Sequence, residues 1–357
     1  MMRVERIRER QAWDALVLAS RDCHITQSYG WGEARAHTGW EPVRMAAFAG
    51  ADCVATMCAY RRRVPGLGAV LDGPRVPLLA AGDDRAWVAL PALLRALGAE
   101  TRAIFIRISP GVTSSDPAYA ARLAACGFAP LPEPWTDWNT PRTVMRLSLA
   151  GSEQDVFRRM AKKRRQQIAS VERTGVVVES GSDLDTLRVF YRMLAEHASR
   201  QRYPVRGWAH FEALHRQFGR DGLMVFVGRV AGEPVSAQLG LRFGAVAYSL
   251  FAPSTAAART SGANEVVQWQ WIRWAHAAAC TAMDFGPSAT PGIARFKVEL
   301  GCRPEVYAPY HDYAFSPRRY GLARCLERRA LPRLRPLAGR IHQLLRSRAR
   351  PVATPAS

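Results

Sequence analysis

The pattern of hydrophobic and polar positions runs in the same order through both halves of the chain. In the first half it predicts a hairpin over 45–62, a helix at about 84–97, a strand over 103–108, a helix around 120–125 and a strand near 143–149. In the second half it predicts a hairpin region over 223–251, a helix at about 263–279, a strand over 282–285, a helix at about 293–300 and a strand toward Tyr307. We therefore expect an α/β (α+β) fold built from two tandem, related units.

Two basic segments add to this organisation. Apolar residues recur at helical spacing over 155–173, among seven Lys and Arg residues, and Ser152 with Asp155 resembles a capping box. This predicts a basic helix, either a solvated face or a contact with RNA or phosphate. We expect a first unit over residues 1–150, a second unit over 151–312 that begins with this helix, and an Arg-rich tail over 313–357.

The tail interleaves arginines with leucines over 318–347, which predicts amphipathic helices interrupted near Pro332 and Pro336. Such a tail can contact anionic membrane through 316–350, or a phosphate backbone, or it can pack its leucines on the body of the protein. The pattern favours none of these over the others.

Charge and composition narrow the class of protein. The 357 residues carry 50 Lys plus Arg against 30 Asp plus Glu, a net charge of +20, with 48% hydrophobic residues, which is typical of a folded, basic protein. Lysine occurs only at Lys162, Lys163 and Lys297. The basic N-terminus predicts no secretion signal, and the scattered cysteines predict reduced thiols and no metal site. We expect a cytoplasmic protein.

The order of elements matches the GNAT acyltransferase architecture, and particular residues resemble one of its families. In the second half these residues are Phe190-Tyr191, Arg200 to Arg206, Ala263-Asn264-Glu265, Asp284-Phe285-Gly286 and Pro291 to Lys297 with Gly301. In the first half they are Gln27 to Trp31, Gly39-Trp40 and Asp72-Gly73-Pro74. Together these resemble the Fem family (FemAB/FemX-like) of peptidoglycan-bridge aminoacyltransferases. That family resembles two fused GNAT folds and moves an amino acid from aminoacyl-tRNA to an amine of a peptidoglycan precursor.

The resemblance implies roles for several residues. Lys297, with the backbone at Phe296 in the Arg295-Phe296-Lys297 motif, would stabilise the oxyanion that forms during acyl transfer. Arg35 and Arg206 would contact the acceptor's phosphates, Arg35 standing where the family has Lys and His210 where it often has Tyr. Arg200, Arg295, Asn264 and Tyr248 complete the substrate-binding prediction, although Tyr248 can equally be a core residue. For a general base, Glu196 and Asp284 remain open.

One loop in the second half is similar to the loop with which GNAT enzymes bind a different donor, acyl-CoA. Arg259 to Asn264 matches all but the last position of the loop in which GNAT enzymes cradle the pyrophosphate of CoA. The final Asn264 can instead cap the following helix, whose Trp269, Trp271 and Trp274 we expect to face the interior.

Three hypotheses follow. The first is a Fem-like aminoacyltransferase of cell wall biogenesis that binds tRNA and a phosphate-bearing envelope precursor and needs no cofactor. The second is an acyl-CoA-dependent GNAT N-acyltransferase for an envelope or exopolysaccharide precursor. The third is a non-catalytic protein that binds nucleic acid or membrane through its charge. The oligomeric state is not predicted.

Overall fold

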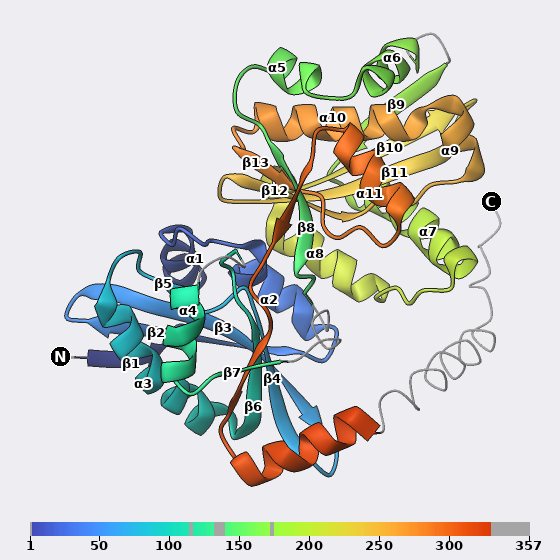
Figure 1. Cartoon of the computed structure of the whole chain (residues 1–357). Helices are drawn as coiled ribbons and strands as arrows, with labels where there is room; N and C mark the ends of the chain where they lie inside the picture. The colour runs from blue at the N-terminus through green and yellow to red at the C-terminus, as the bar shows by residue number, and fades with distance from the viewer. Residues whose placement is uncertain (1, 114–116, 132–139, 172–174, 330–357) are drawn as a thin grey trace.

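The computed structural model describes residues 2–113, 117–131, 140–171 and 175–329, which form two mixed β-sheets covered by helices (Figure 1). Neighbours in the first sheet pair in antiparallel fashion, except for the parallel pair β4–β6. A short strand, β5 (Leu78–Leu79), also pairs with β3. The order along this sheet is β1 (Met2–Arg6), β2 (Glu41–Ala49), β3 (Asp52–Val64), β4 (Gly68–Pro74), β6 (Ala103–Ser109), β15 (His311–Ala314) and β7 (Ala129–Pro130).

The second sheet has the same plan. Its one parallel pair is β12–β13, and its other neighbours are antiparallel. The order is β14 (Arg303–Val306), β8 (Thr143–Ser148), β13 (Ala282–Asp284), β12 (Val246–Phe251), β11 (Glu233–Phe243), β10 (Leu223–Val230) and β9 (Val176–Gly181). Two tandem α/β units followed by a helical segment confirm the predicted fold class.

Each sheet takes one strand from the other half of the chain. β8 precedes the second unit in sequence yet lies inside the second sheet, and β15 follows that unit yet lies inside the first sheet (Figure 1). The boundaries predicted at 150 and 312 therefore do not coincide with the sheets. The reason is that pairing is decided by which sheet offers an open edge to the strand, and this is not encoded in the hydrophobic pattern of the strand itself.

The helices divide the molecule into layers. α3 (Asp84–Thr101) and α4 (Pro117–Ala125) share a core with the first sheet, and α10 (Ala263–Ala277), α5 (Glu153–Arg158) and α6 (Lys162–Val171) share one with the second. A third core is common to both units and contains residues of α1 (Arg10–Leu18), α2 (Tyr29–Ala36), α7 (Leu184–Gln201) and α8 (Trp208–Gly222). Between α1 and α2 lies a short 3₁₀ helix, Ile25–Gln27. The shared core joins the two units into one body.

Most elements lie where the periodicity predicts them, and two segments differ. The basic segment 155–173 is two helices, α5 and α6, in place of the single predicted helix, and the predicted capping box of Ser152 and Asp155 is present. In the predicted tail, residues 317–329 are helical, and the segment around Pro332 and Pro336 lies outside the described residues. In α10, Trp271 is buried and Trp269 and Trp274 are partly buried against the same core.

The two parallel strand pairs differ in one respect that concerns the site. In the first sheet, β4 and β6 stay paired to their ends, at Pro74 and Ser109. In the second sheet, the pairing of β12 with β13 stops at Tyr248 and Asp284, although β12 continues to Phe251. The strands of the second unit therefore part, and those of the first do not.

Candidate functional site

Lys297 anchors the segment that leaves β13. It lies in the last turn of α11 (Pro291–Glu299), and its Nζ donates to the carbonyl oxygens of Phe285 at 2.7 Å, Gly286 at 3.3 Å and Pro287 at 2.6 Å. Partial burial lowers the pKa of the ammonium. The side chain thus lies beside the point where β12 and β13 part, with its three N–H donors directed at backbone carbonyls.

The neighbours of Lys297 on α11 have other partners. The ring of Phe296 is half-buried, and the guanidinium carbon of Arg164 lies 4.7 Å from its centroid. Arg164 also pairs with Glu299 at 2.7 Å. Arg295 is exposed, with 79% of its side chain accessible, and pairs with Glu299 at 2.9 Å. In this arrangement Arg295 contacts α11 itself and none of the other predicted site residues.

Arg35 is held in a buried aromatic setting. Its Nη2 lies 3.2 Å from Asp72 Oδ2, and its guanidinium stacks on Tyr60 and Trp40, with centroids 4.8 and 5.2 Å away. The Nε of Arg35 is buried and has no hydrogen-bond partner among the described residues. A buried guanidinium with an unused donor is suited to an anionic ligand.

Arg206 joins Arg35 across the two units. The pKa of Arg206 is lowered to about 10, first by burial and then by the charge of Arg35. Arg206 Nη1 donates to Nε2 of His210, 3.1 Å away, and His210 Nδ1 donates to the carbonyl of Ala34 at 2.8 Å. Burial, followed by the charge of Arg206, lowers the pKa of His210 to about 4. The structure therefore brings together Arg35, Arg206 and His210, which come from segments far apart in sequence.

Tyr248 lies at the parting of β12 and β13. Its hydroxyl accepts a hydrogen bond from the backbone N–H of Ile25 at 3.3 Å, and the ring of His24 meets it edge-on with centroids 5.0 Å apart. Its partner across the strands is Asp284, whose Oδ2 is 3.9 Å from His24 Nε2 and whose Oδ1 accepts from the Gly286 N–H at 2.7 Å. Burial lowers the pKa of His24 to about 4.

Three residues near Tyr248 and Asp284 were not predicted from the sequence: His24, Arg146 and Arg75. Arg146 lies 3.6 Å from Asp284 Oδ2 and comes from β8. Burial opposes ionisation of Asp284, but its neighbours, Arg146 among them, hold its pKa below the usual range. The buried Arg75 stacks on Tyr307, 3.5 Å from the ring centroid, and donates to the Pro141 carbonyl at 2.7 Å. Arg75 and Arg146 thus place two cations near the Asp284 carboxylate, and His24, whose pKa is lowered to about 4, adds a neutral imidazole. No local motif marks them, because each belongs to a different segment.

The N-terminus of α10 is covered by the protein's own side chains. Gly262 precedes the helix with φ of 75°, and a Cβ built there would lie 2.6 Å from Val171 of α6. Glu265 in the first turn is buried and pairs with Arg164. A pyrophosphate at this helix end would meet a carboxylate and an apolar contact, so the described residues do not fit the phosphate-binding loop of a CoA enzyme.

Asn264 has a different role from the helix cap that its position suggested. Gly262 is the N-cap of α10, no side chain caps the helix, and Asn264 Oδ1 accepts a hydrogen bond from Ser236 Oγ at 2.8 Å. The interpretation of Asn264 as a cap is therefore wrong. Glycine takes that place because the backbone there is left-handed.

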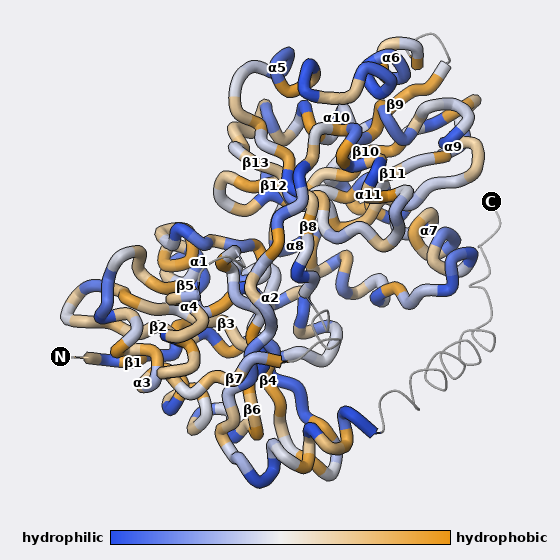
Figure 2. The backbone as a smooth tube through the Cα atoms, in the orientation of Figure 1, coloured by the Kyte–Doolittle hydropathy of each residue, from blue (hydrophilic) through white to orange (hydrophobic). Residues whose placement is uncertain are grey.

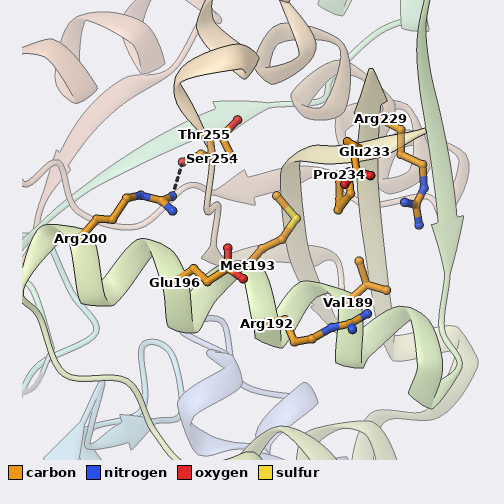
Figure 3. A pocket seen from close by; sticks show the side chains of 10 residues that line it. All are labelled: Val189, Arg192, Met193, Glu196, Arg200, Arg229, Glu233, Pro234, Ser254 and Thr255. Atoms are coloured by element: carbon orange, nitrogen blue, oxygen red, sulfur yellow. Dashed lines mark hydrogen bonds between the residues drawn. The ribbon is translucent and has the colours of Figure 1, made fainter. Parts of the chain in front are cut away.

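Arg200 lines a cavity of about 370 Å³ at the far side of the second unit. The cavity lies between α7 and the ends of the strands, and Arg200 donates to the Ser254 carbonyl at 3.2 Å (Figure 3). Both acidic and basic side chains line it, among them Glu196 from α7 and Glu233 from the start of β11 (Figure 3). Arg200 contacts none of the other predicted site residues.

Comparisons with known proteins concern the chain as a whole. The family model of the acetyltransferase (GNAT) domain matches residues 156–298. The chain is 26% identical over 274 residues to the UDP-N-acetylmuramoylpentapeptide-lysine N(6)-alanyltransferase of Weissella viridescens, covering 70% of this chain and 76% of that protein. Among solved structures it is similar to FemX, with a TM-score of 0.79 and 18% identity over 89% of this chain and 99% of that one. It is also similar to a tandem GNAT protein from the clavulanic acid pathway, with a TM-score of 0.54, 10% identity, and coverage of 88% and 98%.

Proposed function

We propose that this chain, which belongs to the Fem family of tandem GNAT acyltransferases, transfers an amino acid from aminoacyl-tRNA to an amine of a peptidoglycan precursor. The proposal rests on the likeness to an alanyltransferase over most of both chains. The observation in this structure that carries it is the buried pair Arg35 and Arg206, a site built for an anion at the junction of the two units.

The acceptor's phosphates would bind at Arg35 and Arg206. Two guanidinium groups share this region, and the carboxylate that accompanies them is Asp72. Arginine presents a planar fork that matches phosphate oxygens, and a diphosphate can bridge two such forks. The buried Nε of Arg35 is a donor that such a ligand would satisfy. This supports a diphosphate-linked precursor as the acceptor.

The donor would be an aminoacyl-tRNA. Acyl-CoA, the rival donor, is disfavoured by the surroundings of the α10 N-terminus, where its pyrophosphate would bind. Val171 lies 2.6 Å from a Cβ built on Gly262, and the buried Glu265 carboxylate, paired with Arg164, lies in the first turn. A polynucleotide has a surface to contact, since α5 and α6 form a hydrophilic ridge on the outside of the second unit (Figure 2). Lys162 and Lys163 are exposed there, and within the described part of the chain neither side chain has an ion pair or a hydrogen bond.

The reaction would take place beside Lys297. The amine of the acceptor attacks the ester carbonyl of the donor and a C–N bond forms. The C–O bond to the tRNA ribose breaks, and the proton lost by the attacking nitrogen ends, through solvent, on the departing ribose oxygen. The tetrahedral intermediate carries negative charge on the former carbonyl oxygen, which needs a fixed cation or donor. Lys297 can supply it by exchanging one of its backbone carbonyl contacts for the oxyanion.

The decisive experiment is a transfer assay. The purified full-length chain is incubated with radiolabelled aminoacyl-tRNA or acyl-CoA and a lysine-containing, diphosphate-linked precursor, and the donor that is consumed is identified. We expect transfer from aminoacyl-tRNA only. Consumption of acyl-CoA and sparing of the charged tRNA would contradict the proposal.

Variants of Lys297 test the chemistry within the same assay. We expect both Lys297→Ala and Lys297→Arg to lose about 10²–10³-fold in kcat, since the larger, planar guanidinium does not replace a compact ammonium at one point. Arg85→Lys, on an exposed part of α3, is the control and should keep full activity. Full activity in Lys297→Arg would refute a specific requirement for lysine.

The tRNA surface has a separate test. We expect Lys162→Ala with Lys163→Ala to weaken tRNA binding and to reduce its dependence on salt, because each phosphate contact contributes to counterion release. Arg85→Ala with Arg122→Ala, two exposed cations of the first unit, is the matched control. Equal binding and equal salt dependence in both double variants would remove α6 from the tRNA interface.

We place the protein in the cytoplasm, close to the inner face of the membrane on which wall precursors are assembled. In the described part of the chain, no helix combines the length and the apolar character needed to cross a membrane. The membrane contact that we propose is a peripheral one.

A further inference from the structure

The helix formed by residues 317–329 is held firmly by one side. Tyr320 donates to Asp312 at 2.9 Å and packs edge-on against Phe105, with centroids 5.5 Å apart. Glu327 forms an ion pair with Arg107, whose side chain is 0% exposed and also binds Asp312 at 2.8 Å. Because these contacts bury charged groups between the helix and the first sheet, they fix which side of the helix faces outward.

The outward side combines apolar and basic residues. Leu322 is 57% exposed and Leu326, one turn later, is 48% exposed. The exposed arginines of the helix are Arg318, Arg319, Arg328 and Arg329. The helix has one acidic residue, Glu327, and this is on the docked side. The outer face of 317–329 therefore carries two leucines among four cations with no acid between them.

We propose that this face, Leu322 and Leu326 with their flanking arginines, docks on an anionic lipid surface. Single exposed leucines are ordinary, but two on adjacent turns between arginines match the pattern of a helix lying in the plane of a membrane interface, where leucine enters the acyl boundary and arginine meets the headgroup phosphates. The helix stands at the end of the first unit that lies away from the second sheet (Figure 1).

Two other partners fit less well. An RNA backbone would use the arginines and leave both leucines in water, so it does not explain the apolar residues. A second copy of the chain would bring the same four cations face to face. Lipid docking would hold the protein at the membrane location proposed for its function. The usefulness of docking rests on the proposed function, but the docking itself does not, because lipid binding is measured without any transfer reaction.

Vesicle flotation with the full-length protein tests the proposal. The probes are vesicles of phosphatidylcholine alone and of phosphatidylcholine with about one third phosphatidylglycerol. We expect wild type to bind the anionic vesicles at least tenfold more tightly than the neutral ones, and Leu322→Ser with Leu326→Ser to lose at least tenfold. Leu18→Ser with Val88→Ser, two exposed apolar residues at 47% and 73% exposure elsewhere on the surface, should bind as wild type does.

The proposal is overturned if the leucine pair variant binds anionic vesicles as wild type does, or if wild type binds neutral vesicles equally well. A short RNA duplex serves as the second probe. If the leucine substitutions weaken RNA binding as much as vesicle binding, the face is an RNA surface and the proposal also fails. Lost vesicle binding with retained transfer activity in the variant would separate this result from the proposed reaction.

Discussion

The contact between His210 and Arg206 makes the candidate phosphate site sensitive to acid. His210 Nδ1 donates to the Ala34 carbonyl, which leaves Nε2 as the acceptor for the Arg206 guanidinium at 3.1 Å. Protonation of Nε2 would break this hydrogen bond and place a third cation beside Arg206 and Arg35. Burial, and then these charges, lower the pKa of His210 to about 4 from an ordinary value of 6.5.

The sign and size of the effect follow from this pKa. As the pH falls below 6.5 the unfolded chain takes up a proton on this histidine and the folded protein does not, so folding stability is lost until the pH reaches about 4. This difference in pKa between the unfolded and the folded protein corresponds to about 3 kcal/mol of folding stability over the whole pH range. About 2 kcal/mol of it is lost between pH 7 and pH 5. In His210→Gln the amide oxygen can still accept from Arg206, and this contribution to the pH dependence is absent.

Urea unfolding at pH 7, 6 and 5 measures the difference between wild type and His210→Gln. We expect wild type to lose about 2 kcal/mol more than the variant between pH 7 and pH 5. His215→Gln, on the same helix, measures what replacing a histidine by glutamine costs in itself. Parallel curves for wild type and His210→Gln, within about 0.5 kcal/mol at each pH, would refute the reasoning.

Three further predictions concern the same structure. Arg107→Met should cost about 3–5 kcal/mol in urea unfolding, because it leaves the buried Asp312 carboxylate without its cation; a loss below about 1 kcal/mol would contradict this. Gly240→Ala should lower stability by about 1–3 kcal/mol, since a Cβ there would lie 2.1 Å from the Trp271 indole nitrogen, and an unchanged melting temperature would show that the core has room. Arg35→Met and Arg206→Met should each raise KM for the precursor and leave KM for the aminoacyl-tRNA unchanged; a rise in KM for the donor alone would remove both from the acceptor site.

Periodicity predicted the elements well and their pairing poorly. The helices over 84–101 and 263–277 bury one side each, so their period is visible in the sequence. The hairpin strands on either side of Gly50 are continuous buried runs separated by a turn, and this pattern is also visible. Strand 143–148 has the same kind of pattern, but nothing in it states that its neighbours are β13 and β14. The exchange of β8 and β15 between the sheets is a property of the assembled chain.

The site was predicted in part for the same reason. Lys297 stood out because it is one of three lysines and belongs to a motif, and the resemblance supplied Arg35 and Arg206. His24 and Arg146 belong to no motif. Each joins the candidate site only through its contact with Asp284, which lies more than a hundred residues further along the chain. Asn264 shows the opposite error, because a residue typical of caps stands next to a glycine whose left-handed backbone already begins the helix.

The two units divide the proposed work between them. The second sheet parts between β12 and β13, and this opening is where Lys297 and Asp284 lie, whereas the paired β4 and β6 of the first sheet leave no such opening. The first unit contributes Arg35 and His24 instead, both at its boundary with the second unit. Since β8 fills the second sheet between β13 and β14, a fragment limited to the GNAT match at 156–298 would lose the strand that flanks the opening. A proposed site that takes Arg35 from the first unit and Arg206 and Lys297 from the second therefore requires the tandem arrangement.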